Sequence, residues 1–268
     1  MYRNPEPGTW NPEPGTPKAS TLKARGFLMM IAVRSVVAYV LIIVYIAVAG
    51  PVAFVIGGLF RWEGGMFALG HFGVWLALML TGIKYRISGL EQVPPTAVVF
   101  CSNHESNVDP AVLFKGLHRR LRILYKAELR RVPLMATLFD IGGFVPVERA
   151  DREKSLAAIS RGASSLKSGN SFLIFPEGTR SRTGELLPFK KGGFIMAIKA
   201  QAPIVPVAIQ GGRAAMRKGS WLIRPVLTRV HVGQAIETTG LGLEQRDELI
   251  ARVRAAIEAL MHSDPQRA

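Results

Sequence analysis

The chain is poor in two kinds of residue, cysteine and the acidic amino acids. Cys101 is the one cysteine among 268 residues, which excludes an intrachain disulfide and indicates a reducing compartment. Aspartate and glutamate number 19 against 34 lysines and arginines, so the net charge is +15. Such a chain suits an anionic partner, either nucleic acid or a membrane surface. Because hydrophobic residues make up 49% of the chain, the composition favours the membrane.

Two further absences narrow the function. The basic residues are not interleaved with aromatic residues, and no base-reading module is present, which argues against nucleic acid as a partner. His104, Glu105 and Asp109 could in principle bind a metal, but no second histidine lies at the spacing of a zinc site. We therefore expect no bound metal. Cys101, which lies in an apolar run, is expected to be a buried small side chain rather than a nucleophile.

The first 25 residues are expected to form a disordered tail. Residues 4–9 and residues 11–16 both read NPEPGT, and this tandem repeat contains no apolar residue to bury. Proline and glycine dominate it, which is typical of a segment that lacks a packed core. The sequence does not indicate what the repeat does.

Residues 26–84 contain two long runs that lack charged residues. Residues 35–60 carry no charge, and at about 1.5 Å per residue a helix of this length crosses a ~30 Å hydrocarbon core. Gly50-Pro51 interrupts the run and predicts a kink. Residues 66–83 form a second, shorter run that contains His71. We expect two membrane-associating helices; a buried pair of soluble helices is the alternative, and the first run is too long for a signal peptide.

Basic residues on the outer flanks of the two runs predict the orientation. Arg34 and three further basic residues precede the first run, and Lys84 and Arg86 follow the second. Because basic flanks stay in the cytoplasm, this pattern places both outer flanks on the cytoplasmic side. The helices either cross the membrane and return or enter a single leaflet, and the crossing pair is slightly favoured. The expected location is the cytoplasmic (inner) membrane, with the remainder of the chain facing the cytoplasm and the basic surface against anionic membrane lipids.

Residues 85–268 show strand-like apolar runs that alternate with helical patterns. This alternation predicts an α/β domain with a mixed, largely parallel sheet flanked by helices, attached to the N-terminal two-helix membrane-embedded segment. The expected strands are residues 97–101, 121–125, 144–147, 171–175, 204–209 and 229–232. The expected helices are residues 110–117, 133–141, 154–168, 193–200 and 244–261.

A histidine and a carboxylate follow the first strand of this domain. His104 and Asp109 lie five positions apart, directly after the apolar run at residues 97–101. A carboxylate that fixes the tautomer of an imidazole enables it to take a proton from a hydroxyl, so the pair could act as a general base. Asp109-Pro110 is also a favourable helix start, with aspartate as the N-cap and proline at the first helical position. Both interpretations remain open at this point.

A second polar segment, FPEGTRSR at residues 175–182, also follows a buried strand. Gly178 allows the backbone to approach a ligand, and Thr179 and Arg180 can hold a phosphate. A basic surface loop is the alternative. Because the carboxyl ends of parallel strands meet at one edge of a sheet, this loop and the loop of His104 can lie together.

Four ordered motifs resemble those of the glycerolipid acyltransferases. The His104–Asp109 spacing resembles their H-x-x-x-x-D signature, and residues 175–181 match their third motif at every position. Gly143, Pro146 and Arg149 are similar to the second motif, with Glu148 where an aspartate is more usual, and residues 205–207 resemble the fourth. The resemblance covers roughly residues 80–240. The two upstream apolar runs suit the bacterial 1-acylglycerol-3-phosphate acyltransferases.

The resemblance implies transfer of a fatty acyl group from acyl-CoA or acyl-[acyl carrier protein] to the free hydroxyl of 1-acylglycerol 3-phosphate. The product would be phosphatidic acid, in phospholipid biosynthesis, and no cofactor is implied beyond the thioester co-substrate. His104 would be the general base, oriented by Asp109. Glu177, Gly178, Thr179, Arg180 and Arg149 would bind the glycerol phosphate. Two alternatives stay open: the same chemistry on glycerol 3-phosphate, another lysophospholipid or an acylated amino-acid lipid, and an inactive basic protein that binds anionic lipid.

Overall fold

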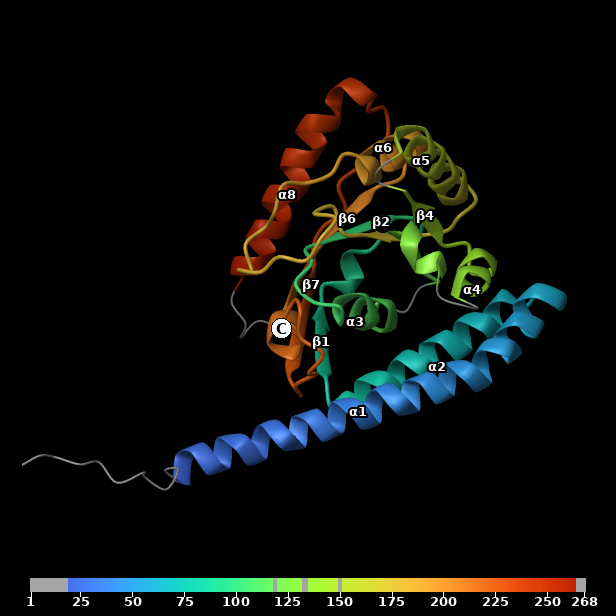
Figure 1. The fold of residues 1–268 in the computed structure, drawn as a ribbon. Coiled ribbons are helices and arrows are strands. Elements are labelled where there is room, and N and C mark those ends of the chain that lie inside the picture. Colours follow the sequence, from blue (N-terminus) through green and yellow to red (C-terminus); the bar gives the residue numbers. More distant parts are fainter. Residues whose placement is uncertain (1–18, 118–119, 132–134, 149–150, 264–268) are drawn as a thin grey trace, which may run out of the picture.

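Two long helices form the base of the molecule, and an α/β domain stands on them (Figure 1). The structure is a computed structural model that describes residues 19–117, 120–131, 135–148 and 151–263. Helix α1 spans Ala19–Phe54, continues as a π-helical turn at Val55–Leu59, and is followed by α2 at Glu63–Thr81. Both helices are long and apolar enough to cross a membrane, judged by length and composition.

The start of α1 corrects the predicted boundary of the tail. Residues 1–18, which include the NPEPGT repeat, lie outside the described residues, but residues 19–25 are helical rather than disordered. Pro17 is the last proline of the tail, and the seven residues that follow Lys18 contain neither proline nor glycine, so the helix of the apolar run extends backward through them. The helix also runs through Pro51 and changes to the π-helical turn four residues later.

Helices α1 and α2 approach each other closely where α2 has a glycine. A Cβ atom at Gly73 would lie 2.5 Å from the ring of Tyr45 on α1, so a larger residue there would separate the helices. One turn earlier on α2, the Leu69 carbonyl accepts a 2.7 Å hydrogen bond from the Tyr45 hydroxyl. Within apolar surroundings such a bond satisfies the phenol without water.

The α/β domain contains a seven-stranded sheet in the order β1-β7-β6-β2-β5-β3-β4. Every pair is parallel except β6 with β7, which confirms the predicted mixed, largely parallel sheet. The strands are β1 Lys84–Ser88, β2 Val99–Ser102, β3 Arg122–Lys126, β4 Val145–Val147, β5 Phe172–Ile174, β6 Ile204–Gln210 and β7 Leu227–Val232. Strand β1 was not predicted, because its KYRIS sequence alternates polar and apolar residues and reads as the basic flank of α2.

Helices cover both faces of this sheet and create two apolar cores. They are α3 Asp109–Gly116, α4 Met135–Ile141, α5 Arg152–Lys167, α6 Gly192–Ala200, α7 Gly212–Ala215 and α8 Arg246–His262. Along the central strand β2 the side chains alternate: Phe100 packs into the core shared with α2 and α3, and Val99 and Cys101 pack into the core shared with α5, α6 and α8. A strand buried on both faces requires the continuous apolar run seen in the sequence.

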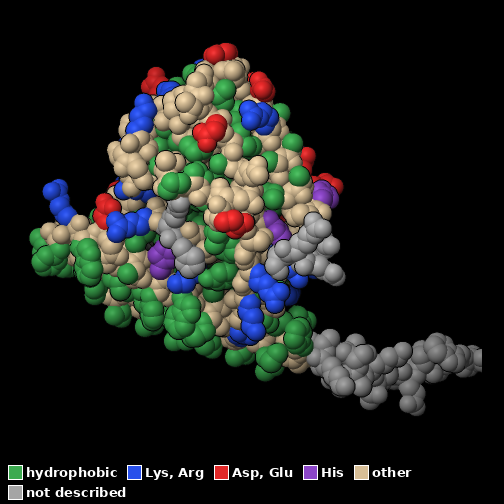
Figure 2. All heavy atoms as spheres, turned by 180° about the vertical axis from the view of Figure 1, so that it is seen from behind, with side chains coloured by type: hydrophobic (Ala, Val, Ile, Leu, Met, Phe, Trp, Pro, Cys, Tyr) green, Lys and Arg blue, Asp and Glu red, His purple; other side chains and the backbone are tan. Residues whose placement is uncertain are grey.

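The α/β domain contacts α1 along much of its length. The Ser35 hydroxyl oxygen accepts a 2.9 Å hydrogen bond from the Ile223 backbone N–H, and the Tyr39 hydroxyl donates to the Trp221 carbonyl. Near the other end, Gly57 packs against Ile141 of α4. These contacts are separated by about 30 Å of helix. Helix α1 therefore lies lengthwise under the domain, and Figure 2 shows hydrophobic side chains gathered along this base.

Candidate active site

The predicted pair of His104 and Asp109 is in contact. The loop between β2 and α3 carries His104, and Asp109 is the first residue of α3. The imidazole Nδ1 lies 3.0 Å from Asp109 Oδ2, where the imidazole side chain is 16% exposed and the carboxylate is fully buried. A carboxylate at Nδ1 sets the tautomer that leaves Nε2 as the basic nitrogen.

Asp109 does not act as an N-cap, contrary to the alternative interpretation of the sequence. The N-cap residue is Val108, and Asp109 lies in the first helical turn. Its Oδ2 accepts two further hydrogen bonds, each of 2.7 Å, from the backbone N–H groups of Glu105 and Ser106. Gly212 packs so closely against Oδ1 that an added Cβ would overlap it. The carboxylate is thus fixed from both sides and cannot turn away from the imidazole.

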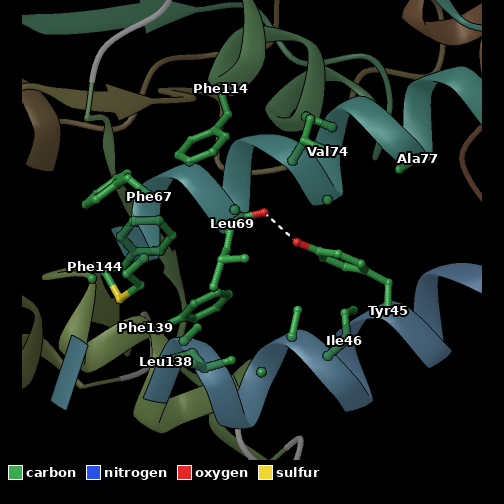
Figure 3. A pocket seen from close by; sticks show the side chains of 18 of the residues that line it. Tyr45, Ile46, Phe67, Leu69, Val74, Ala77, Phe114, Leu138, Phe139 and Phe144 are labelled. Carbon is green, nitrogen blue, oxygen red and sulfur yellow. Dashed lines mark hydrogen bonds between the residues drawn. The ribbon is translucent and has the colours of Figure 1, made fainter. Parts of the chain in front are cut away.

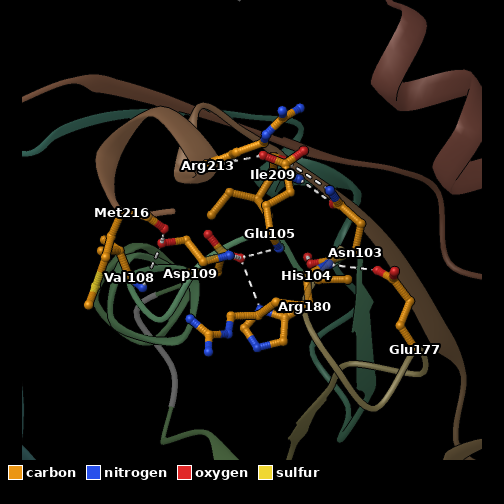
Figure 4. A network of polar contacts seen from close by, with 12 residues as sticks. Asn103, His104, Glu105, Val108, Asp109, Glu177, Arg180, Ile209, Arg213 and Met216 are labelled. Atoms are coloured by element: carbon orange, nitrogen blue, oxygen red, sulfur yellow. Dashed lines mark hydrogen bonds and ion pairs between the residues drawn. The ribbon is translucent and has the colours of Figure 1, made fainter. Parts of the chain in front are cut away.

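The loop after β5 reaches the same place, as the parallel pairing of β2 and β5 predicts. Glu177 Oε1 accepts a 2.8 Å hydrogen bond from the His104 backbone N–H, and the Ser181 N–H donates to the His104 carbonyl at 2.8 Å. The Phe175 ring stacks on the imidazole with 4.2 Å between centroids. The loop after β5 therefore contacts His104 both at its backbone, where Figure 4 shows Glu177, and at its ring.

The predicted substrate-binding residues occupy different environments. Glu177 is buried, and its second oxygen accepts the Leu187 N–H at 3.0 Å, so both carboxylate oxygens are engaged by backbone. Burial raises the pKa of Glu177. Gly178 has φ +67°, a conformation that favours glycine, and Thr179 is exposed. The half-buried Arg180 is on the same side of the loop as the His104 imidazole in Figure 4. Arg149 lies outside the described residues.

Two further polar residues shape the site and were not assigned a role from sequence. The Asn103 carboxamide donates to the Ile209 carbonyl at 2.9 Å and accepts a hydrogen bond from the Ile209 N–H at 2.7 Å. Just past the end of β2, this side chain therefore hydrogen-bonds to the backbone of β6 as a further strand residue would. Glu105 is buried and accepts the Arg213 N–H at 3.3 Å. Burial, together with the nearby Asp109 carboxylate, raises the pKa of Glu105 to about 7. The side-chain types alone gave no signal for either contact, because both partners are about a hundred residues away.

Other reactive groups near the site have no catalytic geometry. Cys101 is fully buried in β2, and burial raises the pKa of its thiol, which confirms the prediction of a small core side chain. Within the described ranges no group of three histidine, cysteine, aspartate or glutamate residues is arranged to hold a metal ion.

An apolar cavity of about 430 Å³ lies between the two base helices and the α/β domain (Figure 3). It is lined by residues of α1, α2, α3 and α4, among them Ala49, Phe67, Phe114 and Phe139. Pro110, in the first turn of α3, also lines it, and this residue directly follows Asp109. Helix α3 therefore contributes residues both to the cavity and to the polar site.

Comparisons with known proteins identify the family. The family described as acyltransferase matches residues 84–210, which include both motif loops. A 1-acyl-sn-glycerol-3-phosphate acyltransferase of Pseudomonas aeruginosa is 29% identical over 86% of this chain and 91% of its own length. One from Limnanthes douglasii is 30% identical over 69% of this chain and 66% of its own length.

A solved structure shares the fold. The 1-acyl-sn-glycerophosphate acyltransferase PlsC from Thermotoga maritima superposes with a TM-score of 0.73 at 24% identity, over 88% of this chain and 98% of that one. The two base helices and this family together indicate that the protein associates with a membrane. The matched sequences and the ordered motifs show that the chain belongs to the acyltransferase family of enzymes.

Proposed function

We propose that this enzyme transfers a fatty acyl group from acyl-CoA or acyl-[acyl carrier protein] to the free hydroxyl of 1-acylglycerol 3-phosphate, giving phosphatidic acid. The observation that carries the proposal is the 3.0 Å contact between His104 Nδ1 and the buried Asp109 carboxylate. The names of the curated relatives support the choice of acceptor. The reaction suits phospholipid biosynthesis at a membrane.

In this mechanism His104 takes the proton of the acceptor hydroxyl as it attacks the thioester carbonyl. A thioester is already activated, so neither a covalent acyl-enzyme nor a cofactor is required. Asp109 holds the imidazole and stabilises the imidazolium that forms. The thiol of CoA or of the carrier protein is the leaving group and receives the proton.

The residues of the FPEGTRSR segment divide into two roles. We assign the phosphate of the acceptor to Thr179 and Arg180, with the Gly178 backbone close by and Arg149 contributing a second guanidinium. Glu177 differs from the expectation: both of its oxygens are used by backbone N–H groups, and a carboxylate would repel a phosphate. Its role is to hold the two loops together. Fixing the phosphate positions the free hydroxyl against His104.

The apolar cavity beneath α3 is proposed to take an acyl chain. Its lining is almost entirely carbon, and it begins beside the residue that orients the base. Its other walls belong to α1 and α2, the helices that contact lipid, so a chain can pass from the membrane without crossing water. Acyl-chain length is then set by the residues that line the cavity.

The base helices are proposed to enter one leaflet of the cytoplasmic membrane. A helix that crossed the bilayer would bury any domain packed along its length in hydrocarbon, where unpaired polar groups are costly. The α/β domain contacts α1 from Ser35 to Gly57, so the helix must lie nearly parallel to the surface. This geometry replaces the crossing pair that the sequence slightly favoured and keeps the site on the cytoplasmic face.

The test is an acceptor and donor screen with the full purified chain in detergent micelles. Labelled acyl-CoA and acyl-[acyl carrier protein] are each offered with 1-acylglycerol 3-phosphate, glycerol 3-phosphate and a lysophospholipid with a diester head group. The proposal expects labelled phosphatidic acid as the main product. Acylation of a different acceptor with greater kcat/KM would reject the proposed substrate, and no transfer to any acceptor would reject the enzyme reaction.

A further inference from the structure

Lys218 lies against the phosphate-binding loop although it is about forty residues away in the sequence. It belongs to the turn after α7, in which the Ser220 N–H donates to the Arg217 carbonyl. Its Nζ donates a 3.0 Å hydrogen bond to the Thr179 hydroxyl and another 3.0 Å hydrogen bond to the Arg180 carbonyl. An ammonium has three N–H donors, so these two contacts fix its position and leave the third for a ligand.

Lys218 and Arg180 form a pair of uncompensated cations. Of the ion pairs found in the described part of the chain, none involves either residue. Glu177, three residues before Arg180, has both carboxylate oxygens occupied by the backbone N–H groups of His104 and Leu187. Two positive charges side by side, on the loop after β5 and on the turn after α7, make no ion pair with any described residue and favour a ligand that carries more than one negative charge.

The acceptors under consideration differ in this charge. The head group of 1-acylglycerol 3-phosphate is a phosphate monoester, with about −1.5 to −2 charges at neutral pH and a second pKa near 6. A lysophospholipid whose phosphate is esterified to a second alcohol carries a single phosphate charge and one fewer free oxygen. A second fixed cation therefore stabilises the bound monoester more than it stabilises the bound diester.

We propose that Lys218 is a binding residue that selects a phosphate monoester acceptor over phosphate diester lipids. The inference rests on the proposed acyl transfer and names what that site recognises. Arg180 supplies one charge to the phosphate, and Lys218 supplies the second through its remaining N–H. Because the ammonium is held by Thr179 and Arg180, the second charge is in place before the ligand arrives.

The test compares acceptors with the full chain in mixed micelles. Lys218→Met is assayed with 1-acylglycerol 3-phosphate and with lysophosphatidylglycerol, the 1-acyl diester with a free glycerol-backbone hydroxyl, and Lys199→Met, at an exposed lysine on α6, is the matched control. We expect KM for the monoester to rise about tenfold in Lys218→Met, the change typical of losing one charge-assisted hydrogen bond. KM for the diester and kcat for the monoester should change less than about threefold. Lys218→Arg should recover most of the discrimination.

The pH dependence separates charge recognition from a structural role. For the wild type, KM for the monoester should rise as the pH falls below about 6, where the phosphate loses its second charge. In Lys218→Met this rise should be smaller. If Lys218→Met does not fold, Lys218→Gln and Lys218→Arg carry the same comparison.

Two results would overturn the inference: an unchanged KM for the monoester in Lys218→Met, or an equal loss of kcat/KM for both acceptors. Either leaves the proposed function intact as long as the wild type makes phosphatidic acid. If the wild type acylates no phosphate monoester, both the proposed function and the role of Lys218 are rejected.

Discussion

Asp109→Asn isolates the charge of the carboxylate from its shape. The wild-type Oδ2 accepts hydrogen bonds from His104 Nδ1 and from the N–H groups of Glu105 and Ser106, all within 3.0 Å. An amide of the same size can keep its oxygen toward the backbone donors, but it no longer carries the charge that stabilises an imidazolium. Its NH₂ group would take the place of Oδ1, which is buried against Gly212 and makes no hydrogen bond with any described residue.

The magnitudes follow from these contacts. A positioned general base contributes about 10²–10⁴ to the rate, so loss of the orienting charge should lower kcat by roughly that range, which is about 3–5 kcal/mol of barrier. A buried amide donor without a partner should lower the free energy of unfolding by about 1–3 kcal/mol. KM for the acceptor should change little, since the side chain of Asp109 is fully buried and does not reach the substrate.

The assay is acyl transfer from a labelled thioester to 1-acylglycerol 3-phosphate, with thermal unfolding measured on the same preparation. Asp247→Asn, on the exposed face of α8, is the matched control and should retain wild-type kcat. If Asp109→Asn retains kcat within threefold of the wild type while remaining folded, the assigned role of the carboxylate is incorrect.

Three further changes test neighbouring parts of the site. Gly212→Ala places a methyl group against the Oδ1 atom of Asp109 and should lower kcat more than it raises KM, measured by initial rates. Glu105→Gln should raise the free energy of unfolding by up to about 3 kcal/mol at about pH 8.5 and change it little near pH 4. The reason is that burial raises the pKa of Glu105 to about 7, so the wild type loses stability as the pH rises through that value; thermal unfolding at both pH values checks the sign. Ala49→Phe fills part of the apolar cavity and should shift the preferred donor to shorter acyl chains, with a long-chain preference equal to wild type contradicting the assigned cavity.

Local patterns in the sequence were sufficient for six of the seven strands and for the pair of His104 and Asp109. The apolar runs before His104 and before Glu177 identified β2 and β5, and the rule that parallel strands end at one edge brought their loops together. That rule depends on backbone geometry alone, so it needed no knowledge of side-chain packing. The resemblance to a known family added the roles of individual residues.

Contacts between distant segments could not be predicted in the same way. Strand β1 is polar on one side, and its identity as a strand depends on pairing with β7, some 140 residues later. Lys218 reaches Thr179 only because β6 and α7 carry the chain back to that loop. Burial of Glu105 and Glu177, and with it their raised pKa values, also results from the assembled fold rather than from adjacent residues.

The placement of helices α1 and α2 also depends on contacts between distant segments. Length and hydropathy identified both segments, but they do not distinguish a crossing pair from one that lies in a single leaflet. The contacts on which the proposed single-leaflet geometry rests join α1 to the segment around Trp221 and Ile223, and the π-helical turn to α4, and all of them involve residues far away in the sequence.

The central claim is that His104 is the base of the acyl transfer, and its most direct test is the rate of phosphatidic acid formation by His104→Ala. The variant should remain folded and bind vesicles as the wild type does, because the imidazole is partly exposed and its backbone contacts to Glu177 and Ser181 do not need the ring. We expect kcat to fall at least about a hundredfold, with membrane binding unchanged. A folded, membrane-bound His104→Ala enzyme with kcat close to wild type would contradict it.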